Sequence, residues 1–291
     1  MLQFIKLIRV HHWVKNGFLF IPVFFAGELF NLHNILLLLG GFIAFSLTAS
    51  SIYILNDYRD IESDRQHPTK SKRPLASGAI STKVALPIAV LFLIGGLGLA
   101  YFIDLRFFVL VIIYFLLNLG YSMGLKNVSI LDILILSSGF LLRTIAGGFI
   151  VDVFISQWLV IMIFLLALFL AIAKRRDDIL IYMESGKMMR KSIQFYNIEF
   201  VNLCITMISG VIIVAYLMYT ISQEVTMRFQ NDHVYYTAVF VIAGVMRYMQ
   251  ITYVEKESGN PTKILYKDRF IQLTLLGWIL CFFAIIYLGK F

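Results

Sequence analysis

The sequence predicts an all-α integral membrane protein, a bundle of nine transmembrane helices that forms one membrane-embedded domain over residues 1–291. Hydrophobic residues make up 60% of the chain and charged residues only 14%, which leaves too little polar surface for a soluble domain. Apolar runs long enough to cross a bilayer recur from end to end. The Lys and Arg residues also alternate between crowded and nearly empty connections, as expected for a multi-pass protein.

The predicted helices follow from the length of the apolar runs, since a membrane span needs roughly 20 such residues. The spans are residues 17–31, 35–55, 84–103, 106–122, 130–150, 156–173, 200–221, 234–250 and 270–289. The first run is short, and residues 1–15 are predicted to lie at the membrane surface as an amphipathic segment with Trp13 at the interface. We expect no cleaved signal peptide, because further spans follow and no pair of small residues stands at cleavage spacing.

The orientation follows from the 25 Lys and Arg residues. With the N-terminus inside, the inside segments hold 21 of them and the outside segments three, while Arg143 lies within a span. Because cytoplasmic connections carry this excess, we expect a plasma-membrane protein whose polar chemistry faces the cytoplasm. The formal net charge of +8 has the same origin, so nucleic acid is not an expected partner. Neither Cys204 nor Cys281 has the spacing of a disulfide or a metal site.

The second span runs into an acidic segment that reads Asn56-Asp57-Tyr58-Arg59-Asp60-Ile61-Glu62-Ser63-Asp64. Asn56, Asp60 and Asp64 are four residues apart, so they share one face if the helix continues beyond the membrane. Mg²⁺ prefers oxygen ligands and commonly bridges one or two carboxylates to substrate phosphates. The spacing therefore predicts a magnesium–diphosphate site; the alternative is a solvated, charged helix end.

Basic side chains follow the acidic segment at once. Lys70, Lys72 and Arg73 stand between two prolines that are expected to break the helix and shape a loop. Alone, such a run marks the inner side of the membrane, but beside three carboxylates it predicts a cradle for phosphate oxygens. His67 has no His or Cys nearby, so we expect it to make a structural hydrogen bond rather than bind a metal.

Several short patterns now resemble a known family. The pattern N-x-x-x-D-x-x-x-D at Asn56, Asp60 and Asp64 resembles the first motif of the UbiA superfamily of membrane transferases. A wider set of patterns is similar to the decaprenyl-phosphate phosphoribosyltransferases within that superfamily and covers nearly the whole chain. This set comprises Trp13-Val14-Lys15-Asn16, the stretch 64–78, Tyr121-Ser122 with Lys126, Ser138-Gly139-Phe140-Leu141-Leu142-Arg143 with Ala146-Gly147-Gly148, Lys174-Arg175-Arg176, and the tail from Gly259-Asn260-Pro261 through Asp268-Arg269 to Trp278.

The resemblance implies a UbiA-like bundle around a cavity that opens to the cytoplasm and laterally to lipid. It also implies a magnesium-dependent reaction in which 5-phosphoribose moves from phosphoribosyl diphosphate to a polyprenyl phosphate, with release of diphosphate. The length of the polyprenyl chain and the oligomeric state are left open, with a homo-oligomer as one alternative.

A later inside loop departs from the wider superfamily. Aromatic prenyltransferases of this fold have a second motif, D-x-x-x-D, in this loop, whereas here Lys174-Arg175-Arg176 precedes Asp177 and Asp178 without a pair of carboxylates four residues apart. The phosphoribosyltransferases usually have K-R-x-x-E at this position, so the resemblance places Asp178 where their glutamate stands. This departure favours the phosphoribosyl donor over a prenyl donor.

Site roles follow from the charges that the two substrates bring, because three phosphate groups near a membrane demand cations. The expected metal ligands are Asn56, Asp60 and Asp64, with Asp57 and Asp178 as further ligands. The residues expected to act on the departing diphosphate are Asp60, Asp64, Lys174 and Arg175. The residues expected to bind substrate are Lys15, Lys70, Lys72, Arg73, Tyr121, Lys126, Arg143 and Tyr182.

Some of these roles have open alternatives. Arg143 lies about 20 Å from the inner end of its span, where charge is usually functional, but it could instead pair with backbone carbonyls. Asp132, at the inner end of the same span, is expected to line the cavity mouth. Tyr121 and Tyr182 could simply be interface tyrosines, and Gly95, Gly96 and Gly98 are expected to allow close helix contact.

Two other functions compete with the phosphoribosyl transferase interpretation. The first is an enzyme of the same fold that moves a prenyl diphosphate onto an aromatic, haem or glycerol-phosphate acceptor. The second is a transporter or channel, which would place charges at the bilayer midplane and often has broken helices in paired halves. Here the charge concentrates at one face and only Arg143 is deep, so a transferase is favoured.

Overall fold

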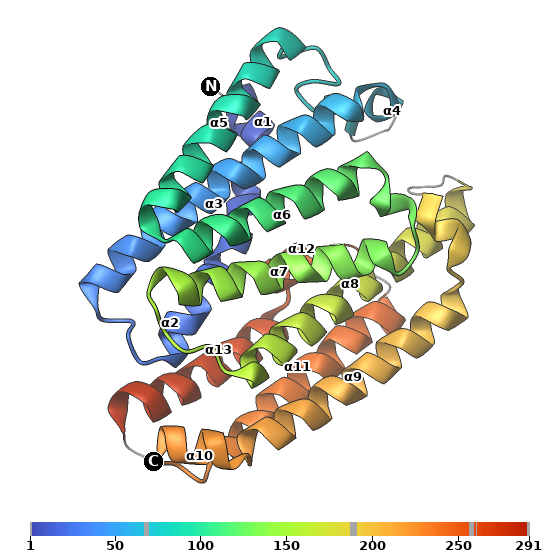
Figure 1. Cartoon of the computed structure of the whole chain (residues 1–291). Helices are drawn as coiled ribbons and strands as arrows, with labels where there is room; N and C mark the ends of the chain where they lie inside the picture. The colour runs from blue at the N-terminus through green and yellow to red at the C-terminus, as the bar shows by residue number, and fades with distance from the viewer. Residues whose placement is uncertain (1, 67–69, 187–190, 256–258, 260, 290–291) are drawn as a thin grey trace. The chain divides into compact units, whose positions relative to one another are not determined.

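The structure is a computed structural model that describes residues 2–66, 70–186, 191–255, 259 and 261–289. Within these ranges the regular structure is entirely helical (Figure 1). The α-helices are α1 (Leu2–Ile8), α2 (Ile21–Phe25), α3 (Leu32–Arg59), α4 (Ile61–Arg65), α5 (Thr82–Ile103), α6 (Leu105–Met123), α7 (Leu131–Ile150), α8 (Gln157–Ser185), α9 (Ile198–Thr220), α10 (Gln223–Phe229), α11 (Ala238–Gln250), α12 (Pro261–Lys267) and α13 (Arg269–Phe283). The 3-10 helices are η1 (Val10–Phe20), η2 (Lys70–Lys72), η3 (Leu125–Asn127), η4 (Lys191–Phe195) and η5 (Val234–Thr237), and π-helical turns extend α11 over Ile251–Glu255 and α13 over Ala284–Leu288.

Eight helical segments in the described residues are long and apolar enough to cross a membrane. They are Leu32–Arg59, Thr82–Ile103, Leu105–Met123, Leu131–Ile150, Gln157–Ser185, Ile198–Thr220, Val234–Glu255 and Arg269–Leu288, and they match eight of the nine predicted spans. The remaining prediction, residues 17–31, is not one long helix: it comprises the end of η1, the five-residue α2 and a turn at Gly27 with φ 79°. A glycine in this left-handed region is a common helix end.

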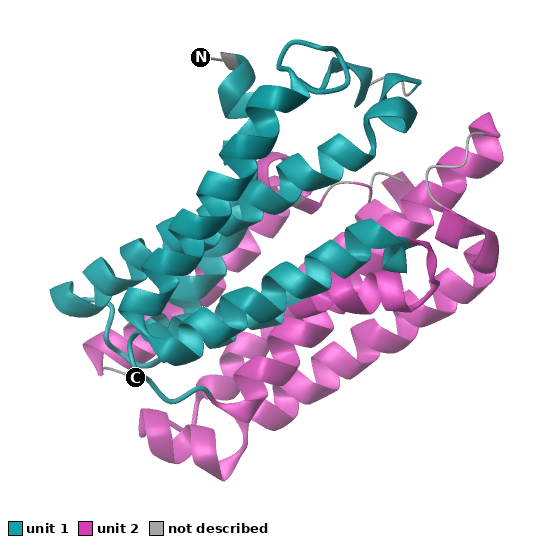
Figure 2. Cartoon of the chain, turned by 45° about the horizontal axis from the view of Figure 1, so that its top comes forward, with its two compact units in different colours: residues 1–126, 139–155 teal, residues 127–138, 156–291 magenta. Residues whose placement is uncertain are grey.

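The chain forms two compact units (Figure 2). Unit 1 comprises residues 1–126 and 139–155, and unit 2 comprises residues 127–138 and 156–291. The helix α7 therefore contributes its first turns to unit 2 and the rest to unit 1.

Unit 1 is organised around α3, which packs against α5, α6 and η1 (Figure 1). Its core contains the fully buried side chains Leu19, Leu38, Phe45, Phe107 and Val111.

Glycine permits the closest part of the packing between α3 and α5. A Cβ atom on Gly96 would lie 2.8 Å from the Ala44 carbonyl oxygen and 2.5 Å from Thr48 Oγ1. The predicted close contact is confirmed at Gly96. At Gly95 a Cβ would meet only Leu47 at 3.8 Å, and at Gly98 it would meet open space, so the prediction is wrong for those two residues.

The 3-10 helix η1 is held against α3 by polar side chains. Trp13 Nε1 donates to Ser50 Oγ at 3.0 Å, and Asn16 Nδ2 donates to Ser46 Oγ at 2.8 Å. On its other side η1 meets α7 backbone to backbone, because a Cβ on Gly147 would lie 1.9 Å from the carbonyl oxygen of Leu19. These contacts explain why the residues after the N-terminal helix form a tightly packed segment rather than a simple membrane span.

Unit 2 is built from α8, α9, α11 and α13, with α9 packed on both α8 and α11. Its core includes Phe169, Ile205 and Ile212, all buried. Toward the other end of these helices, Tyr216 accepts a hydrogen bond from Trp278 Nε1 at 2.6 Å.

Candidate functional site

The acidic segment lies where α3 passes into α4. The backbone keeps helical hydrogen bonds across the junction, from Asp60 N–H to the Asn56 carbonyl at 3.0 Å and from Asp64 N–H to the Asp60 carbonyl at 2.8 Å. At Asp60, however, φ is −93° and ψ is 6°, and α3 ends. The predicted helical continuation to Asp64 therefore exists, but it is broken at Asp60.

The first group of site residues surrounds the Asp60 carboxylate. Lys126 Nζ lies 3.0 and 3.1 Å from the two carboxylate oxygens, and Asn56 Nδ2 donates to Oδ2 at 3.1 Å. Ser122 Oγ, near the end of α6, donates to Asn56 Oδ1 at 3.1 Å. The side chains of Asp60 and Lys126 are each about a quarter exposed, so this ion pair is accessible from outside the protein.

The second group surrounds Asp57 and Asp64, which are both buried. One nitrogen of Arg73, Nη1, lies 2.6 Å from Asp64 Oδ2 and 3.0 Å from Asp57 Oδ1, so it bridges the two carboxylates. Arg9 forms a second ion pair with Asp57. Its left-handed backbone conformation (φ 52°) and its carboxylate partner are not predicted by the sequence, in which Arg9 is one basic residue among the N-terminal charges.

The prediction of one shared face for three oxygen-bearing side chains is therefore only partly right. Asn56 and Asp60 do lie together, but the carboxylate of Asp64 is paired through Arg73 with Asp57, because the break at Asp60 separates α4 from α3. In the described part of the chain no three carboxylate, imidazole or thiolate side chains converge as a metal site would require. The oxygen donors still match the chemistry of Mg²⁺, which commonly takes one or two carboxylates and completes its shell with substrate phosphates.

The remaining predicted residues of the basic loop lie close by. Lys70 and Lys72 form η2, with Lys72 exposed and Lys70 half-buried. The loop is anchored by Arg65, whose Nε donates to the Ala76 carbonyl at 3.2 Å. Tyr121 is half-buried and adjoins Ser122 in α6. His67 lies outside the described residues.

Arg143 is buried in unit 1 and makes three hydrogen bonds. Its Nε donates to Asn16 Oδ1 at 2.8 Å, its Nη1 to the Gly139 carbonyl at 2.6 Å and its Nη2 to the Tyr114 hydroxyl at 2.8 Å. The guanidinium also lies 5.1 Å from the centre of the Phe45 ring, within cation–π range. Arg143 thus does pair with a backbone carbonyl, as the alternative interpretation expects. Its predicted role in substrate binding stays a prediction.

In unit 2, Asp132 and Arg175 form a completely buried ion pair, with 3.0 Å between Arg175 Nε and Asp132 Oδ2. Ser192 Oγ and the Tyr196 hydroxyl donate to the two oxygens of Asp132 at 3.2 and 2.9 Å. Burial raises the pKa of Tyr196, so its hydroxyl keeps the proton that it donates. A second ion pair joins Arg175 to Asp178.

The structure contradicts the prediction for Asp132 and shows that Arg175 and Asp178, two further predicted site residues, are paired with each other. Asp132 does not line a cavity mouth, because its side chain is completely buried between Arg175, Ser192 and Tyr196. Arg175, predicted to act on diphosphate, also has no exposed side-chain surface, and Asp178, predicted to bind metal, is paired with it. The predicted roles of both stay untested. The same holds for Lys174, which is half-buried, and for Tyr182, which is exposed. In the sequence, a single carboxylate at the start of an apolar span is the feature that indicates a buried cationic partner for Asp132.

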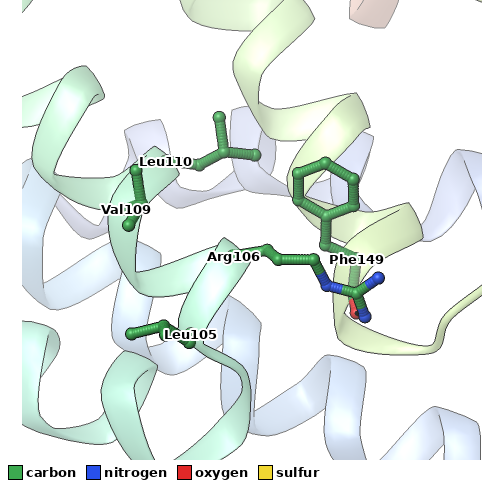
Figure 3. Close-up of a pocket in the computed structure, with 5 residues that line it drawn as sticks. All are labelled: Leu105, Arg106, Val109, Leu110 and Phe149. Carbon is green, nitrogen blue, oxygen red and sulfur yellow. Dashed lines mark hydrogen bonds between the residues drawn. The ribbon is translucent and has the colours of Figure 1, made fainter.

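One cavity of unit 1 lies away from these groups. It measures about 330 Å³ and is lined by Leu105, Arg106, Val109, Leu110 and Phe149 (Figure 3). It lies at the start of α6, whereas Ser122 and Lys126 lie near the end of that helix and just beyond it. Arg106 here stacks over the Phe149 ring and pairs with Asp104 and Asp152, so this cavity contains none of the predicted site residues.

Comparison with known proteins gives concordant results. The model of a family described as "UbiA prenyltransferase family" matches residues 18–271. A Mycolicibacterium smegmatis protein named "Decaprenyl-phosphate phosphoribosyltransferase" is 32% identical, over 97% of this chain and 92% of its own length. A Corynebacterium glutamicum protein of the same name is 31% identical, over 98% of this chain and 86% of its own length.

Solved structures share the fold. A UbiA homolog from Archaeoglobus fulgidus bound to DMAPP and Mg²⁺ has a TM-score of 0.71 at 21% identity and covers 98% of this chain, which matches 99% of that structure. A structure of digeranylgeranylglyceryl phosphate synthase has a TM-score of 0.65 at 19% identity, covering 98% of this chain and 97% of that one. The predicted resemblance is confirmed: the chain belongs to the UbiA prenyltransferase family and is a membrane-embedded transferase.

Proposed function

We propose that this protein transfers 5-phosphoribose from phosphoribosyl diphosphate to a polyprenyl phosphate, in a magnesium-dependent reaction that releases diphosphate. The observation that most supports this is the pairing of the acidic segment with cations that come from other segments. Asp60 is paired with Lys126, and Asp57 and Asp64 are paired with Arg73. The relatives named as decaprenyl-phosphate phosphoribosyltransferases supply the choice of substrates.

These ion pairs suit a site that exchanges its counter-ions on binding. With a magnesium–diphosphate complex present, one or two of the carboxylates can bind the divalent ion, with the Asp60 carboxylate and the Asn56 amide oxygen as the first choice. Lys126 and Arg73 are then available to bind diphosphate oxygens, for which charge-assisted hydrogen bonds are strong. Bound Mg²⁺ would supply Lewis-acid stabilisation of the departing diphosphate. Structures of UbiA homologs with Mg²⁺ and Cd²⁺ bound support the use of a divalent metal in this fold.

The bond changes need little proton transfer. An oxygen of the acceptor phosphate forms a bond to C1 of the ribose, and the bond from C1 to the diphosphate oxygen breaks with its electron pair leaving on diphosphate. The acceptor phosphate is already an anion at neutral pH, so the protein must orient it rather than deprotonate it. The cations of unit 1 stabilise the charge that develops on the leaving group.

We also propose that the site faces the cytoplasm in the plasma membrane and that residues 17–31 complete a ninth pass. The distribution of Lys and Arg supports the orientation. From α3 onward, successive connections lie on alternate sides of the membrane whether or not residues 17–31 cross it. The acidic segment and the basic loop therefore stay on the same side.

A second candidate is a prenyl diphosphate donor with an aromatic or other small acceptor. The Archaeoglobus fulgidus homolog bound to GPP and Mg²⁺, with a TM-score of 0.70, supports it at the level of the fold. The lack of a D-x-x-x-D pattern in the loop after Lys174 argues against it.

The two candidates are separated by offering purified protein, with a polyprenyl phosphate extract, either labelled phosphoribosyl diphosphate or labelled geranylgeranyl diphosphate. We expect a labelled lipid from phosphoribosyl diphosphate alone, lost with EDTA and restored by Mg²⁺. A lipid labelled only from geranylgeranyl diphosphate would replace the proposal with the second candidate.

A further inference from the structure

The cavity of about 330 Å³ at the start of α6 lies near the opposite end of this helix from Lys126 (Figure 3). Because α6 is long and apolar enough to cross a membrane, this cavity and the acidic segment lie near opposite surfaces of the bilayer. The apolar wall of the cavity is formed by Leu105, Val109, Leu110 and Phe149. Leu105 is 61% exposed and Val109 46% exposed, so a lipid chain can reach this wall from outside the protein.

Three charged side chains stand at the rim of the cavity. Arg106 forms ion pairs with Asp104 at 3.1 Å and with Asp152 at 2.9 Å, and its guanidinium lies 5.2 Å from the centre of the Phe149 ring. Asp104 is also the N-cap of α6, where its carboxylate accepts a hydrogen bond from the Phe107 N–H at 3.0 Å. The fold thus uses the Asp104 carboxylate, whereas the Asp152 side chain is 81% exposed. Two carboxylates and one guanidinium leave the rim with an excess of negative charge, which a ligand can reach at Asp152.

Asp152 departs from two local preferences of helix ends. The helix α7 ends at Ile150, and the Val153 N–H donates to the Gly148 carbonyl at 3.0 Å, as in the C-terminal motif whose left-handed position is usually glycine. Asp152 occupies that position with φ 50°. Its carboxylate also stands at the negative end of the helix dipole, where cations are the favoured charges. Conflicts of this kind with local preference are expected at functional sites, and the helix end adds to the attraction for a cation.

We infer that this cavity binds an aminophospholipid, a lipid that carries a primary ammonium, a phosphate and acyl chains. The ammonium donates to the Asp152 carboxylate, the phosphate accepts from Arg106, and an acyl chain lies along the apolar wall. A guanidinium has five N–H groups. Those of Arg106 donate to Asp104, Asp152 and the Phe149 carbonyl, which leaves one N–H of Nη1 without a partner in the described part of the chain.

The charges of the rim select among phospholipids. A lipid with a net negative headgroup would add to the excess negative charge of the rim, so it is disfavoured. A phosphocholine headgroup has the right charges, but its quaternary ammonium has no N–H to donate to Asp152. Only a primary ammonium supplies both the positive charge and the hydrogen bond, and hydrogen bonds between charged groups are the stronger ones.

The test measures lipid binding without turnover. Delipidated protein in detergent is mixed with phosphatidylethanolamine, phosphatidylcholine or phosphatidylglycerol of identical acyl chains, and native mass spectrometry counts the bound lipid. We expect the wild type to bind phosphatidylethanolamine roughly 2- to 5-fold more tightly than either of the others. Asp152→Asn removes the charge, and asparagine also tolerates the left-handed backbone, so this variant should lose the preference and keep the fold.

Two further variants separate the headgroup from the cavity. Asp232→Asn is the matched control, because Asp232 is an exposed carboxylate of the connection between α10 and η5, and it should keep the preference of the wild type. Val109→Trp fills the cavity from an exposed position and should weaken the binding of all three lipids. The unfolding midpoint of each variant, measured in detergent without lipid, checks that the fold is retained.

The inference is overturned if the wild type binds the three lipids equally or prefers phosphatidylglycerol. It is also overturned if Asp152→Asn prefers phosphatidylethanolamine as strongly as Asp232→Asn does, or if Val109→Trp binds all three lipids as the wild type does. These results do not depend on the proposed phosphoribosyl transfer, because no substrate of that reaction is present.

Discussion

In unit 1 the side chains of Arg73, Lys126 and Asp60 each keep about a quarter of their surface exposed, whereas in unit 2 Arg175 and Asp132 are completely buried. Both regions pair arginine or lysine with aspartate near the ends of apolar helices. In unit 1 the cations come from loops and the carboxylates from a helix end. In unit 2 the pair is enclosed further by Ser192 and Tyr196.

This difference separates charges that can change partners from charges that cannot. A partly exposed ion pair contributes little to stability, so a ligand can replace one member at small cost. A buried pair is different, because removing one member leaves an uncompensated charge in the protein interior. We therefore expect substitutions at the Asp60–Lys126 pair of unit 1 to affect catalysis and those in the buried network of unit 2 to affect folding.

The largest effect is expected for Asp60→Asn in unit 1. The substitution keeps the shape of the side chain but removes the charge proposed to hold the metal, so turnover should fall on the order of 100- to 1000-fold. The unfolding midpoint should change little. Glu62→Gln is the control, since Glu62 is an exposed carboxylate of the neighbouring helix α4. Near-normal turnover in Asp60→Asn would refute the metal role.

The second prediction concerns Arg175→Met in unit 2, which leaves Asp132 buried without its cation. The free energy of unfolding should fall by about 3–5 kcal/mol, measured by chemical unfolding in detergent. Asp132→Asn combined with Arg175→Met should recover part of the loss, because the buried charge is gone. A variant that unfolds like the wild type but has no turnover would instead establish Arg175 as the catalytic cation predicted from the sequence.

A smaller effect is expected for Tyr196→Phe, which removes the hydroxyl that donates to Asp132 and accepts from the Ile130 N–H. Loss of this buried partner should cost about 1–3 kcal/mol of unfolding free energy. Tyr266→Phe provides the comparison, since Tyr266 is exposed. Equal stability of the two variants would show that the network tolerates the loss.

The smallest effect concerns a partly exposed ion pair of unit 2, Arg247 with Asp268. The hydrogen bond from Arg247 holds the pKa of Asp268 below its ordinary value of 3.8. The stabilisation is therefore complete above pH 3.8 and is lost as the pH falls through the lower value in the folded protein. The contribution should stay below about 1 kcal/mol. Comparing Asp268→Asn with wild type from pH 7 to pH 3 tests this, and a difference that grows on acidification would contradict the sign.

The sequence predicted the long helices well because the apolar runs that cross a membrane are a local property. Residues 84–103 correspond to α5 at Thr82–Ile103, and residues 130–150 correspond to α7 at Leu131–Ile150. The 3-10 helix η1 was missed, since it depends on hydrogen bonds from Trp13 and Asn16 to a helix 30 or more residues away.

The sequence predicted which charged residues come together at the site but not which of them form ion pairs with each other. The acidic segment and its neighbouring cations were found from composition and spacing, and unit 1 does bring Arg73 and Lys126 to the carboxylates. The role of Arg9 and the burial of Asp132 depend on which distant segments pack together. A pattern of charges does not contain that information.

The close approach at Gly147 lets α7 and η1 lie near enough for Arg143 of α7 to donate a hydrogen bond to Asn16 of η1. A methyl group there would collide with the carbonyl of Leu19, at 1.9 Å, and Leu19 stands four residues after Lys15 in η1. Moving the backbone of η1 away from α7 would lengthen the hydrogen bond between the Arg143 guanidinium and Asn16. An alanine at this uncharged position would thus weaken a buried polar contact one helical turn away.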